Sequence, residues 1–288
     1  MSKGYYAWMV FLGGCSYGIL STIVKVAYEH GISVAEVCGA QGLFGMLLLW
    51  SVAWRWKKAT LGWRRTMGLI LSGSVIGCTT IFYYKSLETL PASLAIIFLF
   101  QFVWIGCGLE WIFFHRRPDR QKIIALGLLL IGSLFATGVQ LEQSSLVFTP
   151  GMLWGFLAAL TYSLLLLISG TVGRDVSPIF KSALMSVGAS GMIFIFFPPM
   201  FLTDVSTLIA LCPYGILLGA FGIALPPLFF SLGIPHVGTG LGSILTASEL
   251  PVAILLACFV LGEQLVFGQW LGIGLILGGI LLGNSQRR

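Results

Sequence analysis

Residues 237–261 read VGTGLGSILTASELPVAILLACFVL, an apolar stretch in which Glu249 is the one charged side chain. A helix needs about 20 such residues to cross the ~30 Å hydrocarbon core of a bilayer. The stretch is long enough, and it is too apolar for a helix that lies on a protein surface. It therefore predicts a membrane-spanning helix.

Nine further runs of this kind occur along the chain and predict nine further spans. With the first, the expected spans are residues 5–28, 33–54, 66–87, 91–114, 122–140, 150–170, 178–200, 212–232, 237–261 and 268–285. The connections between them are short, so no soluble domain is inserted. The predicted fold class is all-α: a polytopic membrane protein with ten transmembrane helices.

The composition supports this interpretation. Of 288 residues, 57% are hydrophobic and only 9% are charged, whereas soluble domains have roughly 25% charged residues. So few charges exclude a soluble enzyme, a nucleic-acid-binding protein and a disordered chain.

The positions of the charges predict the orientation. If the N-terminus is cytoplasmic, all but two of the 16 Lys and Arg residues fall on cytoplasmic segments, the two exceptions being Lys25 and Lys85. Cytoplasmic loops are enriched in these residues. We therefore expect a cytoplasmic (plasma or inner) membrane protein with both termini in the cytoplasm.

The chain also contains a weak internal repeat. Ser16-Tyr17 in the first span is echoed by Thr161-Tyr162 in the sixth, and Gly127 in the fifth span by Gly274 in the tenth. Two five-span repeats are expected, at residues 1–143 and 144–288. Because five is odd, the second repeat enters the membrane from the opposite side. Inverted repeats are typical of carriers that work by alternating access.

Several short motifs resemble the ten-helix EamA-type members of the drug/metabolite transporter superfamily. They are Glu249-Leu250-Pro251, Leu261-Gly262-Glu263-Gln264, Gln269-Trp270-Leu271-Gly272 and, in the first half, Leu90-Pro91-Ala92-Ser93-Leu94-Ala95. The resemblance covers essentially the whole chain. It implies export of amino acids, other metabolites or drugs from a central cavity.

Two positions depart from the family pattern. Phe102 occupies the position equivalent to Glu249, and Gln41 stands where these proteins often carry Arg.

Glu249 is the strongest candidate functional residue because it lies near the middle of its span, where an ionisable group is costly. It would couple transport to protons or pair with a cationic substrate. Alternatively it has a structural role: Pro251 removes the hydrogen bond to the Ala247 carbonyl, and a protonated Glu249 satisfies nearby backbone or a neighbouring helix. Glu110 lies near a helix end, where we expect a solvated ion pair with Arg116-Arg117.

Aromatic and polar side chains in the spans that would line a cavity are candidates for substrate binding. Aromatic rings offer a flat wall that suits aromatic or cationic solutes, although any single ring could instead face lipid. The candidates are Tyr17, Tyr83, Tyr84, Gln101, Trp104, Tyr162, Phe229, Ser248 and Glu249.

Gating residues are expected at the outer helix ends and at prolines. Lys25 and Lys85 either extend to the interface or close an outer gate against Glu29 or Glu88. Prolines within spans break backbone hydrogen bonds and allow bending. The hinge candidates are Pro226, Pro227 and Pro251.

Two other classes of protein remain as alternatives. Ser190 with His236 would make an intramembrane serine protease, although the G-x-S patterns in so glycine-rich a chain arise by chance. A passive channel is the second alternative, but nothing resembles a selectivity filter. The six cysteines are spread singly, so neither a metal site nor another cofactor is expected.

The sequence thus predicts a secondary transporter and no enzyme. It would export either small metabolites, including amino acids and aromatic amino acids in particular, or amphipathic drugs. The mechanism would be alternating access. Its partners would be a small-molecule substrate, the lipid bilayer and, in a coupled mechanism, protons, but no nucleic acid. The Gly274-x-x-x-Gly278 and Gly279-x-x-x-Gly283 patterns predict close helix contacts, within a monomer or between two copies of a homodimer.

Overall fold

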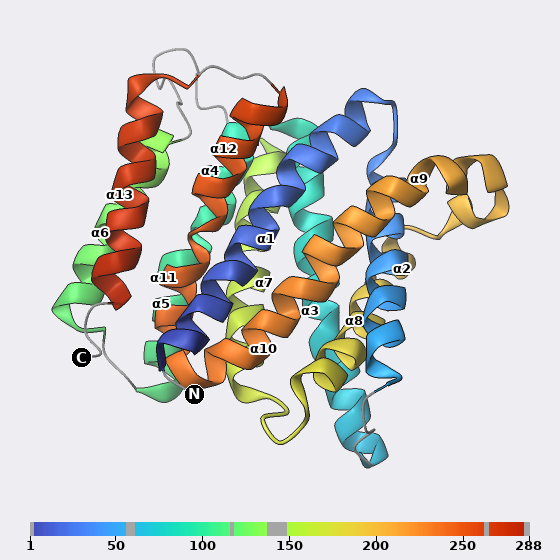
Figure 1. Cartoon of the computed structure of the whole chain (residues 1–288), viewed down its shortest axis with the longest axis horizontal. Helices are drawn as coiled ribbons and strands as arrows, with labels where there is room; N and C mark the ends of the chain where they lie inside the picture. The colour runs from blue at the N-terminus through green and yellow to red at the C-terminus, as the bar shows by residue number, and fades with distance from the viewer. Residues whose placement is uncertain are drawn as a thin grey trace.

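The computed structural model describes residues 3–55, 61–90, 92–115, 118–136, 149–261 and 265–284, and every regular element in these ranges is a helix. The first half contains α1 (Lys3–Glu29), α2 (Val34–Ala53), α3 (Trp63–Thr89), α4 (Ala92–Phe100), α5 (Phe102–Phe114) and α6 (Arg120–Ala136). The helices pack beside one another in one bundle (Figure 1).

The second half repeats this plan. It contains α7 (Pro150–Thr171), α8 (Pro178–Phe196), η1 (Met200–Thr203), α9 (Val205–Leu218), η2 (Gly219–Ala224), α10 (Leu225–Val237), α11 (Thr239–Thr246), α12 (Glu249–Leu261) and α13 (Phe267–Asn284). Three spans are composite: α4 with α5, α9 with η2 and α10, and α11 with α12.

The prediction of an all-α membrane protein is confirmed. Within the described residues, nine helical segments are long and apolar enough to cross a membrane. The tenth span is α6, of which 17 residues are described; the end expected at 137–140 lies outside the described residues.

The two halves pack on each other in reciprocal pairs. α1 of the first half packs on α10 of the second, and α7, the counterpart of α1, packs on α3, the counterpart of α10. Counterparts also pair directly, as α6 with α13 and α2 with α8, and the fourth and ninth spans meet through α5 and α11. Figure 1 shows α6 and α13 side by side at one edge of the bundle. This exchange of contacts is what two related five-span repeats produce.

The eighth span differs from its expected range of 212–232. The helix begins earlier, at Val205, and Pro213 lies inside α9 rather than near its start. Before Pro226, the backbone widens into a π-helical turn, η2, in which the Leu225 N–H donates to the Ala220 carbonyl. Proline has no N–H to donate, so the local hydrogen bonds shift by one residue.

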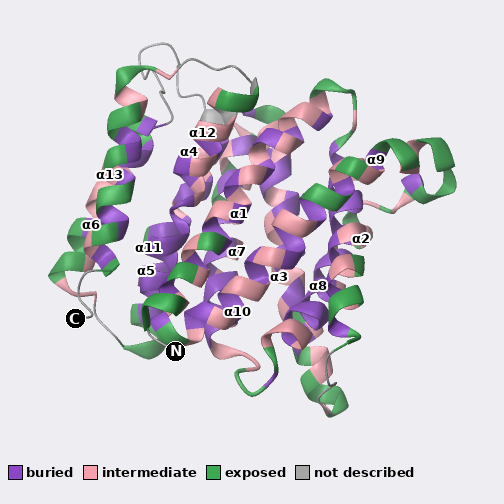
Figure 2. Ribbon diagram, in the orientation of Figure 1, coloured by how far each residue is buried: buried purple, intermediate pink, exposed green. Residues whose placement is uncertain are grey.

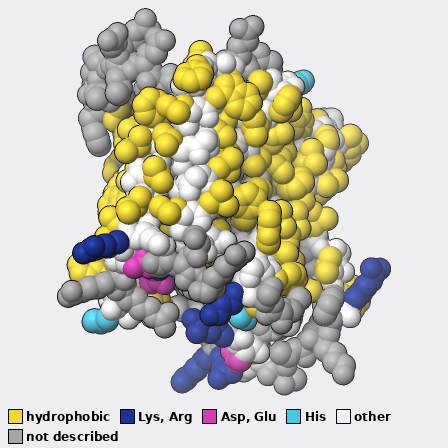
Figure 3. Space-filling model, turned by 60° about the vertical axis from the view of Figure 1, so that its left-hand side comes forward, with side chains coloured by type: hydrophobic (Ala, Val, Ile, Leu, Met, Phe, Trp, Pro, Cys, Tyr) yellow, Lys and Arg dark blue, Asp and Glu magenta, His cyan; other side chains and the backbone are white. Residues whose placement is uncertain are grey.

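The surface is that of a membrane protein. Exposed apolar side chains encircle the bundle, among them Leu71, Ile195 and Phe259. Figure 2 places the buried residues between the helices, and Figure 3 shows an apolar face with Lys and Arg gathered at one end. Trp54 and Trp63 are exposed at this same end of the bundle, where α2 ends and α3 begins. Indole rings favour headgroup depth.

Candidate substrate site

Glu249 lies at a break in the ninth span. α11 ends at Thr246 and α12 begins at Glu249, with a turn between them in which the Leu250 N–H donates to the Ala247 carbonyl at 3.3 Å. The helix break that Pro251 predicts is therefore present. It places Glu249 at the first turn of a half-helix, inside the bundle.

The equivalent span of the first repeat is broken at the equivalent place. α4 ends at Phe100 and α5 begins at Phe102, so that Gln101 is the break residue. The Gln101 N–H donates to the Phe98 carbonyl at 3.3 Å. Two broken spans thus face each other across the centre, each joined from two short helices.

Small residues of α1 bring it directly against the break at Glu249. A Cβ atom on Gly14 would lie 2.7 Å from the Thr246 carbonyl oxygen, and one on Gly18 would overlap the Glu249 carbonyl oxygen. The sequence Gly14-x-x-x-Gly18 is the close-packing pattern of membrane helices. Gly14 and Gly18 therefore form a helix-packing surface.

A cavity of about 40 Å³ lies beside Glu249. It adjoins a smaller space of about 10 Å³ that shares Tyr17, Tyr83, Leu99 and Glu249. Of the residues expected to bind substrate, the structure brings four of the aromatic ones to this cavity together with Glu249: Tyr17, Tyr83, Tyr84 and Tyr162.

Two polar atoms at this cavity are buried without a hydrogen-bond partner in the described part of the chain. They are Oε2 of Glu249 and the hydroxyl of Tyr162. The Tyr162 hydroxyl and the Glu249 carboxyl group are neighbours, but they are not aligned in hydrogen-bond geometry. Buried polar groups are nearly always hydrogen-bonded, and an unsatisfied one carries a cost. A pair of unsatisfied groups at a cavity is suited to binding a polar ligand.

Aromatic rings form the wall around these atoms. Tyr17 meets Tyr162 edge to face, with centroids 5.3 Å apart, and Phe230 lies 5.9 Å from Tyr17. The centroids of Phe102 and Tyr162 are 4.4 Å apart. A ring presents a negative face, so rings around a carboxyl group favour a cation.

Tyr84 and Gln41 are hydrogen-bonded to each other. The Tyr84 hydroxyl donates to Gln41 Oε1 at 2.6 Å. Gln41 lines the cavity, although the sequence singled it out only as a departure from the family pattern.

The polar groups of Ser248 and Gln101 are used within the protein. Ser248 donates to the Phe11 carbonyl at 2.8 Å, which ties the break to α1. The Gln101 amide donates to the Ile97 carbonyl and accepts from the Trp104 indole. Both residues hold the backbone at the two breaks.

Two predicted aromatic residues lie away from the cavity. Trp104 is 42% exposed on the outside of α5, and Phe229 is not among the residues that line the space around Glu249. Phe230 instead packs on Tyr17 and Tyr162 and is fully buried. The one-residue difference turns the ring by about 100° around the helix, which the sequence repeat could not resolve.

The gating candidates are spread over the bundle. Lys85 Nζ lies 5.3 Å from the centroid of the Trp154 ring, a cation–π contact, and no ion pair joins it to Glu88. Lys25 is half-buried in α1. Pro226 and Pro227 are buried directly after the π-helical turn.

Glu110 is not solvated, contrary to expectation. It is 6% exposed, and its Oε2 accepts from Lys122 Nζ at 3.2 Å. Its expected partners at 116 and 117 lie outside the described residues. α6 approaches α5 closely enough for Lys122 to reach across, which spacing along the chain does not reveal.

Ser190 and His236 are engaged in different places. The Ser190 hydroxyl donates to the Gly42 carbonyl at 2.7 Å, between α8 and α2. The His236 ring stacks on Tyr6 at 3.6 Å, at the end of α10. In the described ranges no group of three or more His, Cys, Asp or Glu side chains is arranged to hold a metal ion.

Comparison with known proteins identifies the family to which this chain belongs. The model of the EamA-like transporter family matches residues 4–138 and 149–285, once in each half of the chain. No curated protein matches. One similar solved structure, described only as the crystal structure of a protein, has 13% identity and a TM-score of 0.78 over 99% of this chain and 98% of that one. At that identity the likeness shows the fold alone. Because the family model covers both halves, the chain belongs to the EamA-like transporter family and is a membrane transporter of the drug/metabolite type.

Proposed function

We propose that the chain is a secondary transporter that exports small organic solutes bearing an ammonium group, such as amino acids or amphipathic amines, by alternating access. The observation that carries this proposal is the unpartnered Oε2 of Glu249 at a cavity walled by aromatic rings. A carboxylate supplies the counter-charge for an ammonium group, and the rings add cation–π attraction.

Glu249 then alternates between two partners. A carboxylate enclosed away from water is costly unless a cation or a proton neutralises it. A substrate ammonium group neutralises it in the loaded carrier, and a proton neutralises it when the empty carrier returns. Export would thereby be exchanged for proton entry.

The small size of the cavity supports alternating access. A space of about 40 Å³ is far smaller than the roughly 300–1,000 Å³ of pockets that hold drug-sized ligands. Substrate therefore enters only after the helices move. The breaks at Gln101 and Ser248 and the π-helical turn before Pro226 are the positions where spans lack regular hydrogen bonding and bend most easily.

The proposed location is the cytoplasmic membrane, with both termini in the cytoplasm. Supporting it, α1 begins and α13 ends at the same end of the bundle, where the basic side chains gather (Figures 1 and 3). Basic residues mark the cytoplasmic side of membrane proteins.

Transport into proteoliposomes tests the role of Glu249. L-phenylalanine and phenethylamine serve as probes, with and without a pH gradient. We expect Glu249→Gln to lower uptake of both by about tenfold or more, because a charge-assisted contact contributes about 1.5–3 kcal/mol. Asp175→Asn, which alters a carboxyl group whose side chain is 64% exposed, is the matched control and should leave uptake unchanged.

Two results would contradict the proposal. If Glu249→Gln leaves both uptake and its pH dependence unchanged, the carboxyl group only stabilises the helix break. If transport does not saturate and proceeds at conductance rates, the protein is a channel.

A further inference from the structure

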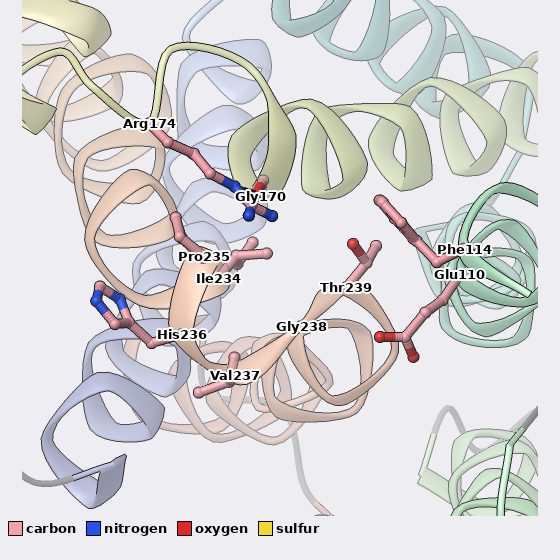
Figure 4. Close-up of a pocket in the computed structure, with 10 residues that line it drawn as sticks. All are labelled: Glu110, Phe114, Gly170, Arg174, Ile234, Pro235, His236, Val237, Gly238 and Thr239. Carbon is pink, nitrogen blue, oxygen red and sulfur yellow. Dashed lines mark hydrogen bonds between the residues drawn. The ribbon is translucent and has the colours of Figure 1, made fainter. Parts of the chain in front are cut away.

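A second and larger cavity lies at the end of the bundle where α1 begins. Its volume is about 220 Å³, against about 300–1,000 Å³ for pockets that hold drug-sized ligands. It lies between the end of α5, the end of α7 and the α10–α11 connection (Figure 4). Its lining residues are Glu110, Phe114, Gly170, Arg174, Ile234, Pro235, His236, Val237, Gly238 and Thr239.

The cavity has a cationic and an anionic side. Arg174 follows α7, and its Nε donates to the Gly170 carbonyl, which fixes the direction of the side chain. In Figure 4 the guanidinium group points toward the space from one side, and Glu110 lies on the other side of Thr239. Within the described ranges, Arg174 makes no ion pair.

Glu110 is held in place but retains a free oxygen. Oε2 accepts from Lys122, and among the described residues none donates to Oε1. Oε1 lies beside Gly238, where an added Cβ atom would be 2.8 Å away. The missing side chain at Gly238 therefore leaves this oxygen accessible from the cavity wall.

The remaining wall is mostly apolar. Phe114, Ile234, Pro235 and Val237 contribute carbon surface, and Thr239 contributes a hydroxyl group. His236 is stacked on Tyr6. A ligand that satisfies these surfaces has an anionic group, an ammonium group and a short apolar part.

The larger cavity and the central one are lined by the same helix, α7. Gly170 follows Tyr162 by eight positions on α7, which corresponds to about 12 Å along the helix. Ile234, which lines the larger cavity, is fully buried one turn after Phe230 and packs against Gly170 and Gly242. Phe230 packs on Tyr17 and Tyr162 of the central cavity, so α10 also has residues near both spaces.

We propose that this cavity is a second binding site, which takes a small zwitterion with its carboxylate on Arg174 and its ammonium group on Glu110. The guanidinium fork matches a carboxylate with two parallel hydrogen bonds. That the cavity binds a zwitterion does not depend on the proposed function. That it loads substrate before Glu249 does depend on it, because this order assumes export.

Equilibrium binding to the purified full-length protein tests the site. The probes are L-leucine and L-phenylalanine, with 4-methylpentanoate and isoamylamine as analogues that carry only one of the two charged groups. We expect Arg174→Gln to weaken binding by about tenfold or more, and each single-charge analogue to bind weaker than L-leucine by a similar factor. Arg174 is exposed, so this variant should fold.

Glu110→Gln should have the same effect, but it leaves Lys122 unpaired and can reduce folding. The double variant Glu110→Gln with Lys122→Met is therefore the second variant on that side, because it removes the carboxylate without leaving the Lys122 cation unpaired. Arg65→Gln, which removes another exposed cation at the same end, is the control and should bind normally. Unchanged affinity in both Arg174→Gln and the Glu110→Gln, Lys122→Met double variant would overturn the proposal.

A lipid headgroup offers the same chemistry as a free zwitterion. Binding is therefore compared in nanodiscs of phosphatidylcholine and of phosphatidylethanolamine. Loss of L-leucine binding only in phosphatidylethanolamine supports the site and identifies a lipid ammonium headgroup as its occupant, and equal binding in both supports a free solute. Glu249→Gln should retain this binding. If it does while its transport is also normal, the central proposal fails and the second site stands.

Discussion

Tyr17 and Tyr162 occupy equivalent positions in the two repeats, and their rings meet edge to face at the centre of the bundle, 5.3 Å apart. The sequence repeat already aligned these two residues. In the structure they converge from α1 and α7 on the cavity beside Glu249. The pairing of two repeats therefore builds one site from both halves of the chain. The carboxyl group at this cavity, that of Glu249, comes from the second repeat.

The Tyr162 hydroxyl separates a binding role from a structural one. Because this hydroxyl has no hydrogen-bond partner among the described residues, Tyr162→Phe should leave the thermal midpoint unchanged or slightly higher. Uptake of L-phenylalanine should nevertheless fall by several-fold, because the substrate loses a polar contact.

Tyr84→Phe is the matched control for that variant. It breaks the hydrogen bond to Gln41 and leaves a buried acceptor unpaired, which costs about 1–3 kcal/mol. We expect a lower thermal midpoint in detergent. A larger loss of stability in Tyr162→Phe than in Tyr84→Phe would contradict this assignment of the two hydroxyl groups.

Gly18 is required for α1 to lie against the Glu249 break. A Cβ atom there would overlap the Glu249 carbonyl oxygen, so Gly18→Ala should cost about 1–3 kcal/mol through overpacking and should also reduce transport. Gly274→Ala is the control, because no atom lies within 4 Å of the added Cβ; the close contact predicted at Gly274 is absent, whereas Gly279 makes one with α6. Measured by thermal unfolding, it should be neutral or stabilising, since alanine favours a helix more than glycine.

Asp204 gives a pH dependence that arises outside the membrane spans. It caps α9, and hydrogen bonds from Thr207 and Ser206 lower its pKa from 3.8 to about 2. A carboxyl group whose pKa falls on folding contributes stability above pH 3.8, and this contribution is lost as the pH falls toward 2. Asp204→Asn should therefore lower the thermal midpoint at pH 7, with the difference from wild type shrinking below about pH 4. A difference that persists unchanged at the lowest pH would show that the carboxylate charge is not responsible.

Most of the fold follows from the sequence because lipid imposes simple rules on it. A backbone in hydrocarbon must satisfy its own hydrogen bonds, so each long apolar run can only be a helix. The break at Glu249 was likewise predictable, because Pro251 has no N–H to donate. The start of the eighth span at Val205 was not predictable, because Pro213 resembles a helix boundary in the sequence but lies inside α9.

The candidate site was less accessible to sequence reasoning, because which side of a helix faces inward depends on packing. A span apolar on all sides carries no periodic signal to distinguish Phe229 from Phe230 or to place Trp104 outside. Gln41 and Phe230 reach the cavity region from spans in the two different repeats. The Glu110–Lys122 pair depends on how α5 and α6 are placed, and the cavity beside Glu110 on how α5, α7 and α10 are placed; no motif reports either arrangement.

The Glu110–Lys122 pair should matter far more for stability than the other ion pair at the same end. Glu110 and Lys122 have side chains 8% and 23% exposed, whereas those of Arg65 and Asp175 are 72% and 64% exposed. Removing one partner of a buried pair costs about 3–5 kcal/mol, because the other charge is left uncompensated, and an exposed pair contributes about 0–1 kcal/mol. We therefore expect Glu110→Gln to lower the thermal midpoint strongly and Arg65→Gln to leave it nearly unchanged. Replacing both charges, in Glu110→Gln with Lys122→Met, should recover part of the loss, because the unpaired cation is gone. A double variant no more stable than Glu110→Gln alone would mean that Glu110 acts through its packing against Gly238 and Gly240 rather than through Lys122.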